Sequence, residues 1–271
     1  MLGPKTTMNG NFKLEDFTGP LNVNLSSTNI STFISCELFK DKICLNNDLS
    51  LSLKLTDDLY QDLAKNRTLL FISGIKAYNP IFINLASEGF YLPIPFDLKA
   101  LVVPKGTLDM GKILVKNSEN ISMIIGLMKY HSFLEMGEMN VWCAPVDFRI
   151  EGGTLYISRM DLLLADSLHI CSFGSIDLIS YKVDMLLGIT ADALEKSFRL
   201  SGLSEDYIME IPLKGNINKL KIDKKFALSK IAELLAPQRG ESHLSFKDLF
   251  KMFKPESKKI PPPKRPYPWE R

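Results

Sequence analysis

The sequence contains few of the residues that build metal centres and nucleophilic active sites. It has only three histidines, His131, His169 and His243, which do not cluster along the chain. The four cysteines, at positions 36, 44, 143 and 171, form no Cys-x-x-Cys pair, which argues against zinc and thioredoxin-like sites. His-Glu-x-x-His, Gly-x-Ser-x-Gly and P-loop motifs are absent as well. We therefore expect a protein that is not an enzyme and that uses neither a metal nor another cofactor.

The remaining polar candidates are predicted to be structural. The cysteines are expected to be buried free thiols, although a Cys36–Cys44 bridge stays open in an oxidising compartment. His169 lies in a predicted strand, and its imidazole is expected to be structural or exposed. Paired carboxylates can perform acid–base chemistry, but the aspartates of this region fall at turns or on polar strand faces and are predicted to be solvated: Asp161, Asp166, Asp177 and Asp184.

Long apolar runs are missing too. The run from Ile121 to Met128 is far shorter than the roughly 20 residues that a membrane-spanning helix needs, and no apolar segment typical of a signal peptide follows the N-terminus. The formal net charge of +2 gives no indication of nucleic-acid binding. Because strand-like sequence begins almost at once, we expect the C-terminal part of a longer protein, or a chain that works beside an anchored β-repeat protein.

What the sequence does contain is apolar residues at every second position. This alternation is typical of strands with one apolar face, and it occurs at 49–55, 81–85 and 146–150. Between 146 and 189 it predicts a meander with turns at 151–153, 166–167 and 172–174. Helical spacing predicts short helices at 56–65, 119–130, 191–200, 224–236 and 246–254.

These patterns predict an α+β, mainly β protein. We expect a curved antiparallel sheet, forming an open β-groove of stacked meanders, with a few short helices. The expected organisation is a β-rich part over 1–145, a β-meander with helices over 146–236, and a linker, amphipathic helix and Pro-rich basic tail over 237–271. Periodicity alone leaves two architectures open: a closed sandwich with an ordinary core, or a curved sheet whose apolar face stays available to acyl chains.

Residues 146–236 carry a resemblance to a known family. The segment 148–155 reads Phe-Arg-Ile-Glu-Gly-Gly-Thr-Leu, and Gly174 is followed by Ile-Asp-Leu at 176–178. A further strand at 183–187, a short helix, Ile-Pro-Leu-Lys-Gly-Asn-Ile at 211–217 and a last amphipathic helix complete the order. This order resembles the C-terminal region of AsmA/TamB-type bacterial envelope proteins. The chain departs from that pattern at Asn218-Lys219, where the family often has proline, and it lacks the usual N-terminal anchor.

The resemblance implies a non-catalytic, AsmA-like module in the envelope biogenesis of a diderm bacterium. Such a module shields or moves phospholipid or another envelope lipid along an apolar β-groove, in the periplasm and peripheral to a membrane. The residues implied to line the groove are Leu155, Ile157, Leu162, Leu164, Leu168, Ile170, Ile176, Leu178, Val183, Met185 and Leu187. The alternative is a scaffold or interaction protein with a closed β core and a partner-binding Pro-rich tail.

The C-terminal segment has its own alternatives. The predicted helix 246–254 places aromatic and apolar residues on one side and lysines on the other, as in a membrane-surface helix, or in a terminal helix that docks on the domain: Phe246, Lys247, Leu249, Phe250, Lys251, Phe253 and Lys254. The Pro-rich tail 255–271 is expected to be extended or disordered, and could serve as a polyproline ligand. Tyr267 and Trp269 could instead sit at a lipid interface.

Overall fold

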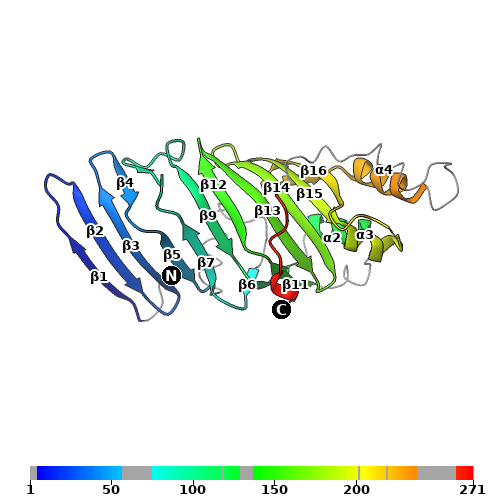
Figure 1. The fold of residues 1–271 in the computed structure, drawn as a ribbon, viewed down its shortest axis with the longest axis horizontal. Helices are drawn as coiled ribbons and strands as arrows, with labels where there is room; N and C mark the ends of the chain where they lie inside the picture. Colours follow the sequence, from blue (N-terminus) through cyan, green and yellow to red (C-terminus); the bar gives the residue numbers. More distant parts are fainter. Residues whose placement is uncertain are drawn as a thin grey trace.

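The computed structural model describes residues 5–56, 75–116, 119–128, 137–200, 202–217, 219–236 and 261–270. Antiparallel pairing joins all of its strands into one curved sheet that does not close on itself (Figure 1). The prediction of a mainly β, α+β protein with a curved antiparallel sheet is therefore confirmed. A sandwich of two facing sheets is not the architecture of the described residues.

The strands follow one another along the chain with few interruptions by helices. Their bounds are β1 (Thr7–Phe12), β2 (Gly19–Ser26), β3 (Ile30–Leu38), β4 (Lys42–Leu45), β5 (Leu49–Leu53), β6 (Ile75–Ala77), β7 (Ile81–Leu85), β8 (Leu92–Pro93), β9 (Val103–Asp109), β10 (Lys112–Lys116), β11 (Glu138–Cys143), β12 (Val146–Glu151), β13 (Thr154–Leu164), β14 (Leu168–Asp177), β15 (Lys182–Thr190), β16 (Ile208–Asn216) and β17 (Lys219–Ile222). The helices are α2 (Glu119–Leu127), α3 (Ala191–Phe198), α4 (Lys224–Leu235) and the 3₁₀ turn η3 (Pro268–Glu270).

The main row of the sheet runs β1-β2-β3-β5-β7-β9-β12-β13-β14-β15-β16-β17. A side branch starts at β13, whose first half pairs with β12 and whose second half pairs with β11. From β11 the branch continues through β10 to β6. The sheet therefore divides at β13 into a long arm toward β1 and a short arm toward β6.

The regular strand pairing is interrupted where the two arms separate. Gly111 lies between β9 and β10, and Ala144-Pro145 lies between β11 and β12. In β13 the register shifts between Ile157 and Met160, which is a β-bulge. Because proline and positive-φ glycine interrupt regular pairing, these breaks let β10 and β11 leave the long arm, with Gly111 at φ 57°.

The main hydrophobic core lies at the helix-bearing end of the sheet. Strands β10, β11 and β13–β17 contribute one side, and helices α2, α3 and α4 contribute the other. Ile113, Ile125, Ile189, Leu194 and Ile211 are each at most 1% exposed there. The described helices pack mainly on β14–β17 and therefore cover one end of the sheet (Figure 1). They do not pack on the long arm.

Local sequence explains where the helices begin. Thr190 caps α3 by accepting a hydrogen bond from the Ala193 N–H, and Asp223 caps α4 by accepting from the Phe226 N–H. The helices predicted at 119–130, 191–200 and 224–236 correspond to α2, α3 and α4. The predicted helices at 56–65 and 246–254 lie outside the described residues, apart from Thr56.

One predicted turn is wrong. Ser172-Phe173-Gly174 does not end a strand but lies inside β14, which is 10 residues long. Gly174 has φ 135°, and a Cβ there would lie 2.5 Å from the Asp184 carbonyl oxygen. Glycine at this position therefore allows β15 to approach closely and does not reverse the chain. The chain reverses after Asp177, whose carboxylate accepts hydrogen bonds from the Ile179 and Ser180 N–H groups.

Two glycines with opposite surroundings test the packing of the sheet and core. A Cβ on Gly188, in β15, would lie 2.5 Å from both Cys171 Sγ and Ile208 Cγ2, whereas a Cβ on Gly126, in α2, meets nothing within 4 Å. Gly188→Ala should therefore destabilise the protein by about 1–3 kcal/mol through overpacking. Gly126→Ala should stabilise it by up to about 1 kcal/mol through helix propensity. Urea unfolding of both variants checks the pair, and equal effects would contradict the packing described.

Candidate functional site

The cross-strand register places apolar residues of neighbouring strands on the same face of the sheet. Residues opposite one another in a ladder share a face, so each row of partners can be followed across the strands. One row, from β5 to β17, reads Leu49, Leu85, Gly106, Phe148, Ile157, Gly174, Met185, Leu213 and Ile222. A second, from β1 to β12, reads Met8, Leu25, Thr32, Leu51, Ile83, Leu108 and Val146. We call the side that carries these rows the apolar face.

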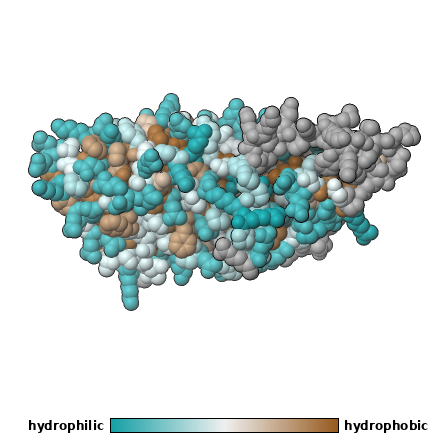
Figure 2. Space-filling model, in the orientation of Figure 1, coloured by the Kyte–Doolittle hydropathy of each residue, from teal (hydrophilic) through white to brown (hydrophobic). Residues whose placement is uncertain are grey.

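The opposite face of the same strands is mainly polar. The row next to the second one reads Asn24, Phe33, Ser50, Asn84, Thr107 and Asp147. Beyond it lies Arg149, Tyr156, Ser175, Asp184, Lys214 and Lys221. The side seen in Figure 2, on which the C-terminal segment crosses the sheet, is largely hydrophilic with separate apolar patches. The two faces of the sheet therefore differ in chemistry along most of its length.

The apolar face is only partly covered on the long arm. Val23, Leu51, Ile83 and Leu85 are half-buried rather than buried, and Met8 at the far end is 70% exposed. Phe148 lies over Gly106, where a Cβ would come within 2.3 Å of its ring, so an aromatic side chain fills the space above the glycine. The apolar face of the long arm therefore combines half-buried side chains with buried ones, such as Ile81 and Val103.

The residues predicted to line a lipid groove fall into two environments. The register puts those on β13, β14 and β15 on the apolar face. Leu164, Leu168, Ile170 and Leu187 belong to the main core under the helices, and Leu162 packs against it. These residues contact the protein's own core. Ile176, Val183 and Met185 form a second buried cluster, which Leu155, Ile157 and Leu178 border as half-buried residues.

The residues predicted to form a membrane-surface helix, 246–254, lie outside the described part of the chain. None of the described helices is long and apolar enough to cross a membrane. Among the described side chains, no group of three or more His, Cys, Asp or Glu residues could hold a metal ion. Cys36 and Cys44 are free thiols, as are Cys143 and Cys171. Burial raises the pKa of Cys143 and of Cys171 to about 12, so neither is a ready nucleophile.

A polar cluster on the opposite face was not predicted from the sequence. Residues 261–270, which we call the C-terminal strap, cross β13 and β14 there (Figure 1). Asp161 of β13 accepts hydrogen bonds from Arg159 at 2.8 and 2.9 Å and lies 3.0 Å from His169 Nε2. The Tyr267 hydroxyl of the strap donates to the same carboxylate at 3.2 Å. Asp161 is only 4% exposed, so the prediction that it is solvated is wrong.

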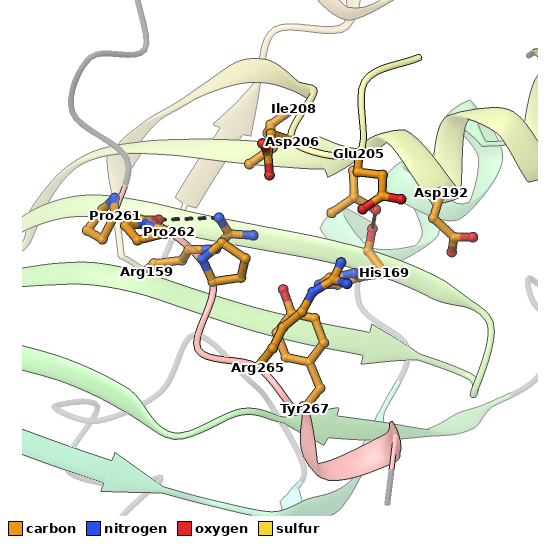
Figure 3. Close-up of a pocket in the computed structure, with 12 residues that line it drawn as sticks. Arg159, His169, Asp192, Glu205, Asp206, Ile208, Pro261, Pro262, Arg265 and Tyr267 are labelled. Atoms are coloured by element: carbon orange, nitrogen blue, oxygen red, sulfur yellow. Dashed lines mark hydrogen bonds between the residues drawn. The ribbon is translucent and has the colours of Figure 1, made fainter. Parts of the chain in front are cut away.

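Aromatic stacking holds the strap in place beside this carboxylate. Tyr267 is 2% exposed, stacks on Trp269 at 4.6 Å and meets the His169 ring edge-on at 4.9 Å. The Arg159 guanidinium donates to the Pro261 carbonyl oxygen, and Lys264 forms an ion pair with Asp147. Figure 3 shows Arg265 and Tyr267 beside His169, with Arg159 reaching toward the prolines. The tail is thus ordered over these residues, and Tyr267 is committed to the protein itself rather than to a lipid interface.

Next to the strap lies a cavity of about 340 Å³, lined by Arg159, His169, Thr190, Asp192, Glu205, Asp206, Ile208, Pro261–Pro263, Arg265 and Tyr267 (Figure 3). The Thr190 hydroxyl donates to the His169 carbonyl oxygen, so it is already engaged. Burial disfavours the ionised Asp161, but hydrogen bonds from His169 and Arg159 outweigh it and lower the pKa of the carboxyl group. Burial and the nearby Asp161 raise the pKa of Tyr267. Arg159, His169 and Tyr267 all contact the Asp161 carboxylate, so these contacts anchor the strap to the sheet.

Comparison with protein-family models, with curated proteins and with solved structures finds no match to this chain. The resemblance to AsmA/TamB-type proteins therefore rests on the motifs of residues 146–236 alone. A fold by itself does not imply a function, so the function has to be argued from the chemistry of the two faces.

Two ion pairs on neighbouring strands, each between residues two positions apart, allow the contribution of the buried cluster to stability to be measured. Arg159–Asp161 has side chains 10% and 5% exposed, whereas Arg149–Glu151 has side chains 49% and 65% exposed. Asp161→Asn should lower the free energy of unfolding at neutral pH by about 3 kcal/mol, because it leaves Arg159 buried without its anion. Glu151→Gln should cost at most about 1 kcal/mol. Urea unfolding measures both, and equal losses would show that the buried cluster does not anchor the strap.

The effect of Asp161→Asn should also depend on pH. Because the pKa of Asp161 is lower in the folded protein than its ordinary 3.8, its contribution is complete above that value and is lost as the pH falls through the folded pKa. The difference between wild type and Asp161→Asn should therefore shrink as the pH falls below about 4. A difference that stays constant down to about pH 2 would contradict the assignment.

Proposed function

We propose that this chain is a non-catalytic lipid-shielding module that holds acyl chains against the apolar face of its sheet. The observation that carries the proposal is the pair of mainly apolar rows, which together reach from β1 to β17, combined with helices that pack mainly at one end. An acyl chain needs a long, non-directional apolar surface, because each methylene removed from water contributes about 0.8 kcal/mol. The two rows, which are rich in leucine and isoleucine, supply such a surface.

The part of the face available to a lipid is the long arm. The predicted lining residues under α2, α3 and α4 are part of the protein's own core. We therefore assign the lipid site to β2–β12 instead. There the half-buried Leu51 and Ile83 face each other across β5 and β7, and Leu108 follows on β9. Between this strip and the main core, Ile176, Val183 and Met185 are buried in the second cluster. The proposed site is therefore a strip that begins at the open end and stops at the second cluster.

The cellular setting of this module is proposed from the motif resemblance. AsmA/TamB-type proteins act in the envelope of diderm bacteria, and the resemblance supports a proposed role in envelope biogenesis, with phospholipid as the proposed cargo. A scaffold that recruits partners through its Pro-rich tail is less favoured, because the strap residues Tyr267 and Trp269 already pack on His169.

Adjacent residues on one strand provide a matched test. Ile83 lies on the apolar face, and Phe82 lies on the opposite face, where it is 41% exposed. With a benzophenone amino acid at Leu51 and vesicles of phosphatidylethanolamine and phosphatidylglycerol, ultraviolet light should crosslink the protein to phospholipid. Ile83→Asp should reduce the yield on the order of tenfold, because it places a charge beside the acyl chain. Phe82→Asp should leave the yield unchanged.

Two controls make the result interpretable. The benzophenone placed at Ser50, on the opposite face next to Leu51, should give little lipid adduct. Circular dichroism and thermal unfolding should show that Ile83→Asp and Phe82→Asp retain the sheet to the same extent. Equal crosslinking from positions 50 and 51, or a yield that Ile83→Asp does not alter, would overturn the proposal.

A further inference from the structure

The first strand forms an open edge of the sheet that lacks the usual protection. β1 (Thr7–Phe12) pairs with β2 on one side, and no described segment pairs with its other side. In Figure 1 it is the end strand opposite the helices. All of its residues are exposed, including Met8 at 70% and Phe12 at 71%. Proteins usually guard such an edge with lysine, proline or a bulge, and β1 contains none of them.

The hydrogen-bonding groups of this edge can be assigned from the neighbouring pair. The Lys13 N–H donates to the Pro20 carbonyl oxygen of β2 at 3.2 Å. In an antiparallel strand, alternate residues direct their backbone groups to the same neighbour. Thr7, Asn9 and Asn11 therefore bond toward β2, and Met8, Gly10 and Phe12 direct their backbone N–H and C=O groups away from the sheet. These last three residues are a template for one more antiparallel strand.

We propose that the partner of this edge is β1 of a second copy of the chain. If Gly10 lies opposite its own counterpart, Met8 of one copy faces Phe12 of the other on the apolar face, and the match occurs twice. Thioether–aromatic contact is favourable, and the outward backbone groups of both strands pair completely in this register. On the opposite face, Asn9 stands beside Asn11 of the second copy.

Charge supports the same register. The alignment that pairs Gly10 with itself also brings Lys5 of one copy opposite Glu15 of the other, and both residues are exposed. The other end of the main row differs, because β17 is only four residues long and contains two lysines. A head-to-tail chain of copies is therefore less favourable than a closed, two-fold pair through β1.

The pairing would join two sheets into one. A two-fold axis perpendicular to the sheet keeps the apolar faces of both copies on the same side. The row that reaches Met8 in one copy would continue through Phe12 of the next and on to its Leu21 and Cys36. Edge pairing does not depend on what the apolar face binds, so it can be tested without lipid.

Two double variants test the register directly. The like-charge variant carries Met8→Lys with Phe12→Lys, and the opposite-charge variant carries Met8→Glu with Phe12→Lys. Both remove the same apolar side chains, and within one chain positions 8 and 12 are too far apart on a strand to form an ion pair. Sedimentation equilibrium of the full chain from about 1 to 200 µM should show a weak dimer, as expected for a small interface.

Wild type should dimerise most strongly, the opposite-charge variant less so, and the like-charge variant least. The like-charge variant should dimerise about tenfold more weakly than the opposite-charge variant, because each contact occurs twice, and the gap should narrow at high salt. Phe33→Lys, a substitution of a 53%-exposed aromatic residue away from the edge, should dimerise as wild type does.

A photo-crosslink locates the contact. Benzophenone at position 12 should give a covalent dimer whose crosslink maps to Met8 of the other copy, and benzophenone at position 33 should not. A chain that remains monomeric over the whole concentration range overturns the proposal. So does a dimer in which the two double variants behave alike, or one whose crosslinks map away from β1; capture of a strand from a different protein by β1 would likewise replace the second copy as the partner.

Discussion

The cross-strand register is the constraint on which the rest of this structure depends. Each strand offers apolar side chains at alternate positions, and a shift of one residue in any pair would turn a whole strand's apolar set to the other face. The register instead aligns Leu49, Leu85, Phe148, Ile157 and Met185 in one row, with glycines of β9 and β14 between them. A core at one end and an apolar strip at the other are two uses of this single face.

The bulge in β13 shows how closely the sequence respects that constraint. Leu155 and Ile157 occupy odd positions, whereas Leu162 and Leu164 occupy even ones, so an unbroken strand would place the two pairs on opposite faces. The register shift between Ile157 and Met160 restores them to one face. It also turns Arg159 and Asp161 outward together, so the same irregularity that preserves the apolar face creates the anchor of the strap.

Much of the architecture was predictable because alternation and helix capping are local signals. The strands at 49–53, 81–85 and 146–151, and the helices near 119, 191 and 224, follow from residues close in sequence. The turn at 172–174 was mispredicted because serine and glycine are common in reversals, whereas Gly174 is required by the backbone of Asp184 across the ladder. That requirement exists only between strands and has no local signature.

The candidate site was predictable only in part for the same reason. Periodicity identifies which residues share a face, but it cannot tell that Leu164, Leu168, Ile170 and Leu187 lie under helices while Leu51 and Ile83 do not. The contact between the strap and the sheet was harder still to predict, because Tyr267 and Asp161 are separated by 106 positions in the sequence. A signal did exist: two opposite charges at alternate positions in an otherwise apolar strand, followed much later by aromatics in a proline-rich segment that can adopt an extended path.

The division of the sheet explains why lipid and a second copy can both be neighbours of the same arm. A sheet with no described layer over its long arm buries its apolar side chains only partly, and it ends at a strand with unpaired backbone groups. These two features are independent of each other. The incompletely buried apolar side chains point out of the sheet, whereas the unpaired backbone N–H and C=O groups lie in its plane. An acyl chain can satisfy only the first, and a paired strand can satisfy only the second. Because they do not compete, a longer sheet made by edge pairing would extend the surface that the lipid needs.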